Sequence, residues 1–224
     1  MASITQDHRT TFEVNVSKET FKFNAAHFVA FPGFRERLHG HNYKLSVRLL
    51  GSRKIGGDGY VLDFGDVKKA TKDVCKSLNE YFICPIYSNA IDISECKNEA
   101  GSETVKLVCL DGAEFVFPKS DCAMLPIVHS TAEELAMFLW GEILLKLDAT
   151  YLVKRGIHTM EVTCAEAIGQ EALFRHEIPD TNSVEEIKKV CDVRNFIMSG
   201  ELLAKPCLPV QTDKNEPCPH CGSK

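Results

Sequence analysis

Two histidines, His39 and His41, are two residues apart, separated only by Gly40, in the stretch LHGHNYKLSV, residues 38–47. The residues that follow alternate between apolar and polar, which is the period of a β-strand, so both imidazoles should face the same side. His27 ends an earlier segment of the same period, TFKFNAAHF, and shares the register of its apolar residues. If the two strands pair as an antiparallel hairpin, the three imidazoles meet.

Three neutral imidazoles that leave a fourth position open are typical of a catalytic zinc ion, because structural zinc sites are usually closed by four protein ligands. Such an ion acidifies a bound hydroxyl group and polarises oxygen. The alternative is that the histidines only pack in the interior of an oligomeric barrel. The spacing favours a Zn²⁺ site formed by His27, His39 and His41.

The chain has the composition of a globular domain and lacks the features of several other classes. It has 224 residues, 44% hydrophobic and 25% charged, with a formal net charge of -5. No run of Lys or Arg suggests nucleic-acid or membrane-surface binding. No stretch reaches the ~20 apolar residues of a membrane span, and the N-terminus lacks the apolar region of a signal peptide. We therefore expect a cytoplasmic protein whose ten cysteines are mostly reduced.

Hydrophobic periodicity predicts an α+β fold. Period-two segments indicate four strands, and periodic apolar stripes indicate two helices. The second helix should begin at Ser130, with Glu133 completing a capping box. The order strand, strand, helix, insertion, helix, strand, strand predicts a four-stranded antiparallel sheet with two helices on one face. Its exposed edges would be closed if the sheets of several subunits joined into a barrel.

The main domain is predicted to span residues 11–178, after a flexible N-terminus at 1–10. Residues 84–128 form an insertion, in which a hairpin should turn at Asp111–Gly112. A helical extension follows at 179–199, and residues 200–224 should have little order. Cys218 and Cys221 form a single C-x-x-C pair in that tail, which is a weak signal for metal or redox chemistry.

Five short motifs in this order resemble the 6-pyruvoyltetrahydropterin synthase family: FNAAHF, LHGHNY, GYVLDFGDVKK, HSTAEE and VTCAEA. The resemblance implies the tunnelling fold, whose subunits join their sheets into a barrel, commonly as a homohexamer with active sites between subunits. It also implies that the three histidines bind zinc, that Glu166 anchors the guanidine-like edge of a pterin, and that Thr131 contacts the pterin. A carboxylate suits that edge because it accepts two N–H groups at once.

One departure from the family concerns the catalytic base. Family members that make 6-pyruvoyltetrahydropterin have a cysteine shortly before the H-x-H motif, but no cysteine lies between His27 and His39. Glu36 is the only carboxylate there, as in a branch of the family that cleaves the substrate's side chain. Glu36 could instead be a surface charge paired with Arg35 or Arg37, and these two arginines are also candidates for binding the triphosphate.

These residues favour a zinc-dependent lyase that converts 7,8-dihydroneopterin triphosphate into 6-hydroxymethyl-7,8-dihydropterin, a folate precursor. A carboxylate can carry an oxygen-bound proton, whereas removal of carbon-bound protons favours a thiolate. The alternatives are 6-pyruvoyltetrahydropterin synthase, which eliminates the triphosphate in the tetrahydrobiopterin pathway, and a protein that binds pterin or zinc without catalysis. A carboxy-pterin synthase is less favoured because the cysteine is absent.

A second departure follows the first predicted helix. The family usually has an Asp-His pair at this point, but here the corresponding residues are Asn79 and Glu80. Because an amide does not titrate, the usual proton carrier is missing. His129 is a candidate for a replacement catalytic imidazole, and the alternative is a capping or buried histidine.

Overall fold

The computed structural model describes residues 11–197. The predictions for residues 1–10 and 200–224, including the Cys218 and Cys221 pair, lie outside the described residues. Within the described part of the chain, no helix is both long and apolar enough to cross a bilayer.

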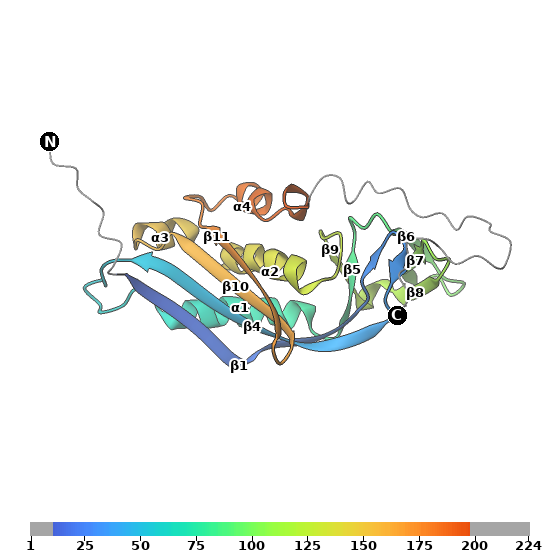
Figure 1. Cartoon of the computed structure of the whole chain (residues 1–224), viewed down its shortest axis with the longest axis horizontal. Coiled ribbons are helices and arrows are strands. Elements are labelled where there is room, and N and C mark those ends of the chain that lie inside the picture. Colours follow the sequence, from blue (N-terminus) through green and yellow to red (C-terminus); the bar gives the residue numbers. More distant parts are fainter. Residues whose placement is uncertain (1–10, 198–224) are drawn as a thin grey trace, which may run out of the picture.

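Four antiparallel strands form one side of the main sheet, as predicted, and the outermost of them, β11, is an edge strand (Figure 1). The strand order across the sheet is β11-β10-β4-β1-β5-β9. The four antiparallel strands are β1 (Phe12–His27), β4 (His39–Ser52), β10 (Thr159–Ala167) and β11 (Gln170–Glu177). Two short strands that the sequence did not predict extend the sheet beyond β1 in parallel: β5 (Tyr81–Pro85) and β9 (Cys122–Leu125).

The two predicted helices, α1 (Phe64–Leu78) and α2 (Ala132–Lys146), lie on the same face of this sheet (Figure 1). The periodic apolar residues of α1 are all buried: Val67, Ala70, Val74 and Leu78. A continuous core fills the space between helices and sheet, and Phe23, Tyr43 and Trp140 are among its fully buried side chains. Two shorter helices follow, α3 (Ala149–Lys154) and α4 (Val184–Val190), and the last element among the described residues is a 3₁₀ turn, η2 (Val193–Asn195).

The predicted start of α2 was wrong by one residue. Thr131 is the N-cap, and its hydroxyl accepts a hydrogen bond from the backbone N–H of Glu134. The side chain of Ser130 is buried and donates instead to the main-chain carbonyl of Phe28, at 2.9 Å. Tertiary contact with the end of β1 therefore overrides a capping role for Ser130.

The inserted segment forms a separate antiparallel sheet, defined here as the inserted sheet, of β6 (Ile91–Lys97), β7 (Glu103–Cys109) and β8 (Glu114–Pro118). A 3₁₀ turn, η1 (Lys119–Asp121), leads from it back to β9. The hairpin between β7 and β8 turns at Asp111–Gly112, as predicted, and Gly112 has a φ of 83° that suits glycine. Buried residues of the inserted sheet form a second core together with Phe28, Ala30 and buried residues of β5 and β9.

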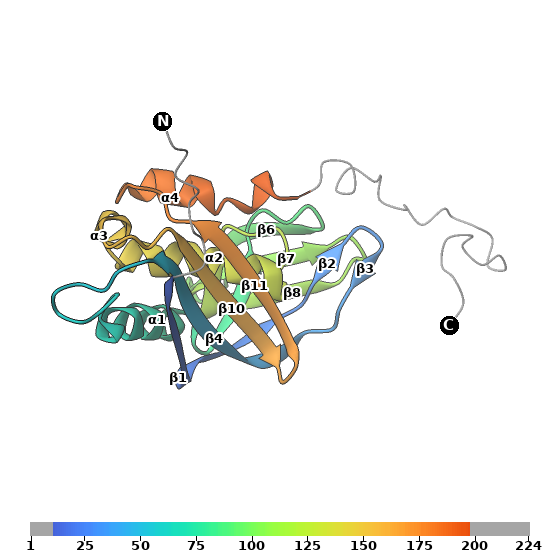
Figure 2. The same ribbon diagram turned by 60° about the vertical axis from the view of Figure 1, so that its left-hand side comes forward.

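The chain between β1 and β4 makes a small hairpin of β2 (Ala30–Phe31) and β3 (Phe34–Arg35). This hairpin lies beside the inserted sheet (Figure 2). The residues that follow β3 lead directly into His39. The inserted sheet is thus placed next to the segment that separates the first predicted metal ligand from the other two.

Candidate metal centre

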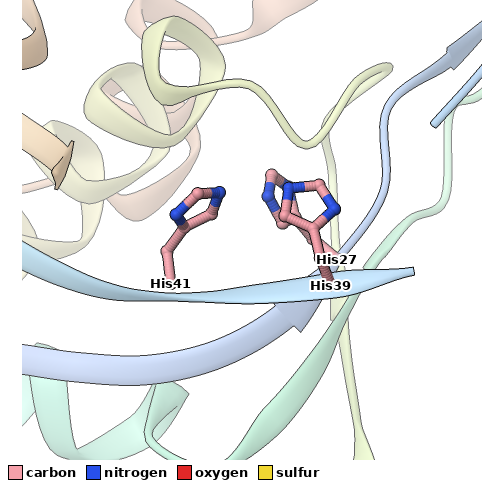
Figure 3. A group of neighbouring side chains, drawn as sticks. All are labelled: His27, His39 and His41. Atoms are coloured by element: carbon pink, nitrogen blue, oxygen red, sulfur yellow. The ribbon is translucent and has the colours of Figure 1, made fainter. Parts of the chain in front are cut away.

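Antiparallel pairing of β1 with β4 brings the three histidines together, as predicted. His27 is the direct cross-strand partner of His39, and Ala25 is the partner of His41. The three rings project from the same side of the strand pair (Figure 3), and one nitrogen atom from each can be chosen so that all lie within 4.8 Å of one another. A single metal ion can bridge groups at this spacing.

Hydrogen bonds fix the ring orientation of two of these histidines. His27 Nδ1 lies 2.8 Å from the carbonyl oxygen of Ser130, and His39 Nδ1 lies 2.7 Å from that of Arg37. Because a carbonyl oxygen only accepts, each Nδ1 carries the proton, and each Nε2 presents its lone pair. Metal-bound histidines usually donate their other ring N–H in this way.

The buried Nε2 of His27 supports the fit of a metal ion. Among the described residues, it is the only buried side-chain nitrogen or oxygen atom that has no hydrogen-bond partner. Burial lowers the pKa of His27 to about 4, and the nearby rings of His39 and His41 act in the same direction, while the Ser130 carbonyl and the Glu36 charge oppose the shift. The imidazole is therefore neutral at pH 7, as metal binding requires.

The three histidines differ in exposure, which leaves one side of the group open. His27 is buried, His41 is half-buried and His39 is exposed. A cleft of about 440 Å³ adjoins His27 and His39, and it is also lined by Glu36, Thr131 and Glu166. An ion held by the three imidazoles would have an open coordination position that a ligand in this cleft could reach.

Glu36 lies in the same cleft and is hydrogen-bonded to Val29, two residues after the end of β1. Its Oε2 accepts a hydrogen bond from the backbone N–H of Val29 at 3.0 Å, and its own N–H donates to the Val29 carbonyl at 2.9 Å. The guanidinium of Arg35 pairs with Asp111 and donates to the main-chain carbonyl of Glu36. The alternative was that the Glu36 carboxylate pairs with Arg35 or Arg37, and among the described residues neither arginine forms an ion pair with it.

Glu166, near the end of β10, is half-buried and is contacted by Tyr43. The Tyr43 hydroxyl donates to Glu166 Oε1 at 3.4 Å, and its ring stacks on Phe23. Burial raises the pKa of Tyr43, as does the charge of Glu166, so the phenol keeps its proton and remains a donor. Sequence analysis assigned Tyr43 no role, although it follows His39 and His41 on the same face of the strand.

His129 does not line the cleft that Glu36 and Glu166 share. Its Nδ1 lies 2.8 Å from Oε1 of Glu134, and the other oxygen of that carboxylate accepts the backbone N–H groups of Val128 and His129 at 2.7 and 2.9 Å. Glu134 is buried and was missed by sequence analysis. These contacts hold the segment whose next carbonyl, that of Ser130, orients His27.

The residues in place of the family's Asp-His pair have structural contacts. Asn79 is the C-cap of α1, and its side-chain oxygen accepts the backbone N–H of Asn24 at 3.0 Å. Glu80 has a φ of 69°, and its N–H donates to the carbonyl of Asn24. Both residues therefore attach the end of α1 to β1.

Comparison with known proteins assigns the family. The family model for 6-pyruvoyl tetrahydropterin synthase matches residues 15–177. The chain belongs to the 6-pyruvoyltetrahydropterin synthase family. A Methanocaldococcus jannaschii protein provisionally named 6-carboxy-5,6,7,8-tetrahydropterin synthase is 31% identical over 163 residues, which are 73% of this chain and 94% of that protein.

Solved structures of the family have the same fold. The 6-pyruvoyltetrahydropterin synthase of Plasmodium falciparum is 39% identical with a TM-score of 0.71, and that of Plasmodium vivax is 41% identical with a TM-score of 0.70. Each match covers 75% of this chain and 99% of the Plasmodium chain. The P. vivax protein has also been solved with a catalytic glutamate replaced by alanine or by cysteine.

This membership confirms the predicted family and the α+β tunnelling fold of the subunit. It also gives the coarse function, because the 6-pyruvoyltetrahydropterin synthase family consists of lyases that act on pterins. The roles of Glu36, Glu166, Thr131 and His129 stay predictions.

Proposed function

We propose that this chain is a zinc-dependent lyase that cleaves the side chain of 7,8-dihydroneopterin triphosphate and releases 6-hydroxymethyl-7,8-dihydropterin for folate synthesis. The observation that carries the proposal is that the Glu36 carboxylate lines the same cleft as His27 and His39. No cysteine lies in residues 28–38 to serve as an alternative base. A glutamate is also named as a catalytic residue of the P. vivax relative.

The proposed reaction requires one proton to move from the oxygen of the 2'-hydroxyl to the carbon C1'. Bound Zn²⁺ would lower the pKa of a substrate hydroxyl. Glu36 accepts the proton of the 2'-hydroxyl, the C1'–C2' bond breaks, and C2' leaves as an aldehyde with the triphosphate attached. The electron pair left on C1' takes a proton, which Glu36 returns, and this gives the hydroxymethyl product. No oxidant or reductant is consumed.

Three other residues orient the pterin in this proposal. The carboxylate of Glu166 accepts two N–H groups from the guanidine-like edge. Tyr43 supports it, because the phenol contacts one carboxylate oxygen and leaves the other free. Thr131 lies in the same cleft and contacts the pterin. His129, whose ring nitrogen Nδ1 is held by Glu134, would have only its other nitrogen for proton transfer.

Two other products are possible for an enzyme of this family. Elimination of the triphosphate would give 6-pyruvoyltetrahydropterin, and the M. jannaschii relative is named for a carboxy-pterin. Both reactions need removal of carbon-bound protons, for which a thiolate is the better base. The carboxylate of Glu36 therefore favours side-chain cleavage.

We also propose a homohexamer in the cytoplasm, which acts on this small molecule and binds neither nucleic acid nor membrane. Strand β11 lies at the edge of the sheet, and no strand within residues 11–197 pairs with its outer side. Pairing of such edges between subunits would close the sheets into a barrel. Size measurement by light scattering tests the hexamer.

The decisive experiment incubates the purified, zinc-analysed protein with 7,8-dihydroneopterin triphosphate and identifies the pterins by chromatography and mass. We expect the hydroxymethyl pterin from the natural chain, about 100-fold less from Glu36→Gln, and a shift toward the pyruvoyl pterin from Glu36→Cys. Each variant should retain its zinc, because Glu36 is not among the three grouped ligands. Unchanged turnover by Glu36→Gln would refute the assignment of the base.

A further inference from the structure

The inserted sheet touches the loop that carries Glu36. We define the Glu36 loop as residues 28–38, between the first and second metal-ligand histidines. Arg35 of this loop reaches across to the turn between β7 and β8, where its Nε donates to Oδ2 of Asp111 at 2.7 Å. Two segments that are 76 residues apart in the sequence are thereby joined next to the cleft.

Arg35 makes two further contacts that place its guanidinium between the inserted sheet and Glu36. One terminal nitrogen donates to the main-chain carbonyl of Glu36 at 2.9 Å. The guanidinium also lies over the ring of Phe115 of β8, 5.6 Å from its centroid. The Arg35 side chain is 21% exposed, so part of its charge is shielded from water and its position is restricted.

An apolar contact fixes the other end of the Glu36 loop to the same sheet. Phe28 is 1% exposed, and its ring stacks on that of Phe115 at a centroid distance of 5.0 Å. Ala30 is buried in the same core. Phe115 therefore contacts the loop at both ends, through Phe28 and through Arg35.

The geometry points to the inserted sheet as a positioning device for Glu36, with Asp111 and Arg35 as positioning residues. The two hydrogen bonds between Val29 and Glu36 stay within the loop and do not connect it to a strand of the main sheet. Ser130 fixes the first residue of the loop by donating to the Phe28 carbonyl, and the contacts of Arg35 and Phe28 with the inserted sheet attach the rest of the loop, including the part that carries Glu36. This inference rests on the proposed function for its catalytic consequence, but not for the attachment itself.

The turn at Asp111 allows a conservative test. Its Oδ1 accepts the backbone N–H of Ala113 at 3.0 Å, and its Oδ2 accepts from Arg35. In Asp111→Asn, the amide oxygen can keep the turn contact, while the amide nitrogen is a donor and cannot accept from Arg35. Glu114→Gln is the matched control, because Glu114 pairs with Lys106 at 2.9 Å on the same sheet and does not touch the loop.

Hydrogen exchange measured by mass spectrometry on the full chain tests the attachment without any need for turnover. We expect the peptide that covers residues 28–38 to exchange about fivefold faster in Asp111→Asn. This factor corresponds to loss of an ion pair whose interaction free energy is near the upper end of the range measured for exposed pairs. Glu114→Gln should leave this peptide unchanged. Equal exchange in Asp111→Asn and the natural chain would overturn the inference.

Kinetics test the consequence for Glu36. We expect kcat of Asp111→Asn to fall about fivefold with KM and zinc content unchanged, and Arg35→Gln to show no further loss when Asp111→Asn is added. A fall that tracks thermal stability or zinc content would overturn a positioning role. If the natural chain did not turn the substrate over, the proposed function would fail, whereas the exchange result would still decide whether the inserted sheet holds the loop.

Discussion

Replacing Glu134 by alanine is the most direct test of what holds the candidate metal centre. This buried carboxylate accepts the backbone N–H groups of Val128 and His129 and the ring N–H of His129. The next residue, Ser130, accepts the Nδ1 proton of His27 through its carbonyl. Loss of the carboxylate should therefore loosen both the segment and the orientation of the metal ligand.

The magnitude follows from the contacts that are lost. Two buried or half-buried amide groups would lose a charged acceptor, at about 1 to 3 kcal/mol each. We expect the free energy of unfolding to fall by about 3 kcal/mol. Removing a group that orients a metal-bound histidine costs about 10- to 100-fold in metal affinity. Since Glu134 acts on His27 only through Ser130, we expect the affinity for zinc to fall about tenfold, at the lower end of that range.

The assay compares thermal unfolding with zinc affinity, the latter from competition with a chromophoric chelator. Glu134→Gln should lie between the natural chain and Glu134→Ala, because its amide oxygen can still accept backbone N–H groups. Glu142→Ala, a half-buried position further along α2, serves as the control and should leave zinc affinity unchanged. If Glu134→Ala lowered stability but bound zinc as tightly as the natural chain, the link from Glu134 to His27 would be wrong.

Two further predictions concern Tyr43 and His27. Tyr43→Phe removes the donor to Glu166, so KM for the pterin should rise about fivefold, which equals about 1 kcal/mol. The kcat and the melting temperature should stay close to those of the natural chain. An unchanged KM in steady-state assays would contradict this role. Burial lowers the pKa of His27 to about 4. Between pH 6.5 and pH 4 the unfolded metal-free chain therefore binds more protons than the folded chain, and the free energy of unfolding decreases as the pH is lowered. Denaturant titrations of metal-free protein should show that slope, and it should be smaller in His27→Gln.

The grouping of the three histidines was predictable because strand periodicity fixes which side chains share a face. His39 and His41 are two residues apart, and one assumption, the pairing of two adjacent strands, was enough to add His27. Strands β5 and β9 were missed for the opposite reason. They contain five and four residues, and short apolar runs carry no period that separates a strand from a buried loop.

The local errors arise where tertiary contacts decide between equal local choices. Ser130 and Thr131 are both good capping residues, and each is followed by a glutamate three positions later, at Glu133 and Glu134. The Phe28 carbonyl binds the Ser130 hydroxyl and leaves the cap to Thr131. No local pattern reveals that contact. The pairing of His129 with Glu134 was equally hidden, because a capping role explained the neighbouring residues without it.

The three-histidine group lies at the junction of two hydrophobic cores. Ala25, two residues before His27, is buried in the core between the main sheet and its helices, and Phe28, one residue after it, is buried in the core of the inserted sheet. Regions with separate cores can open separately. An ion held by His27, His39 and His41 would cross-link the strand ends at this junction, so its binding energy would couple the unfolding of both regions into one cooperative transition.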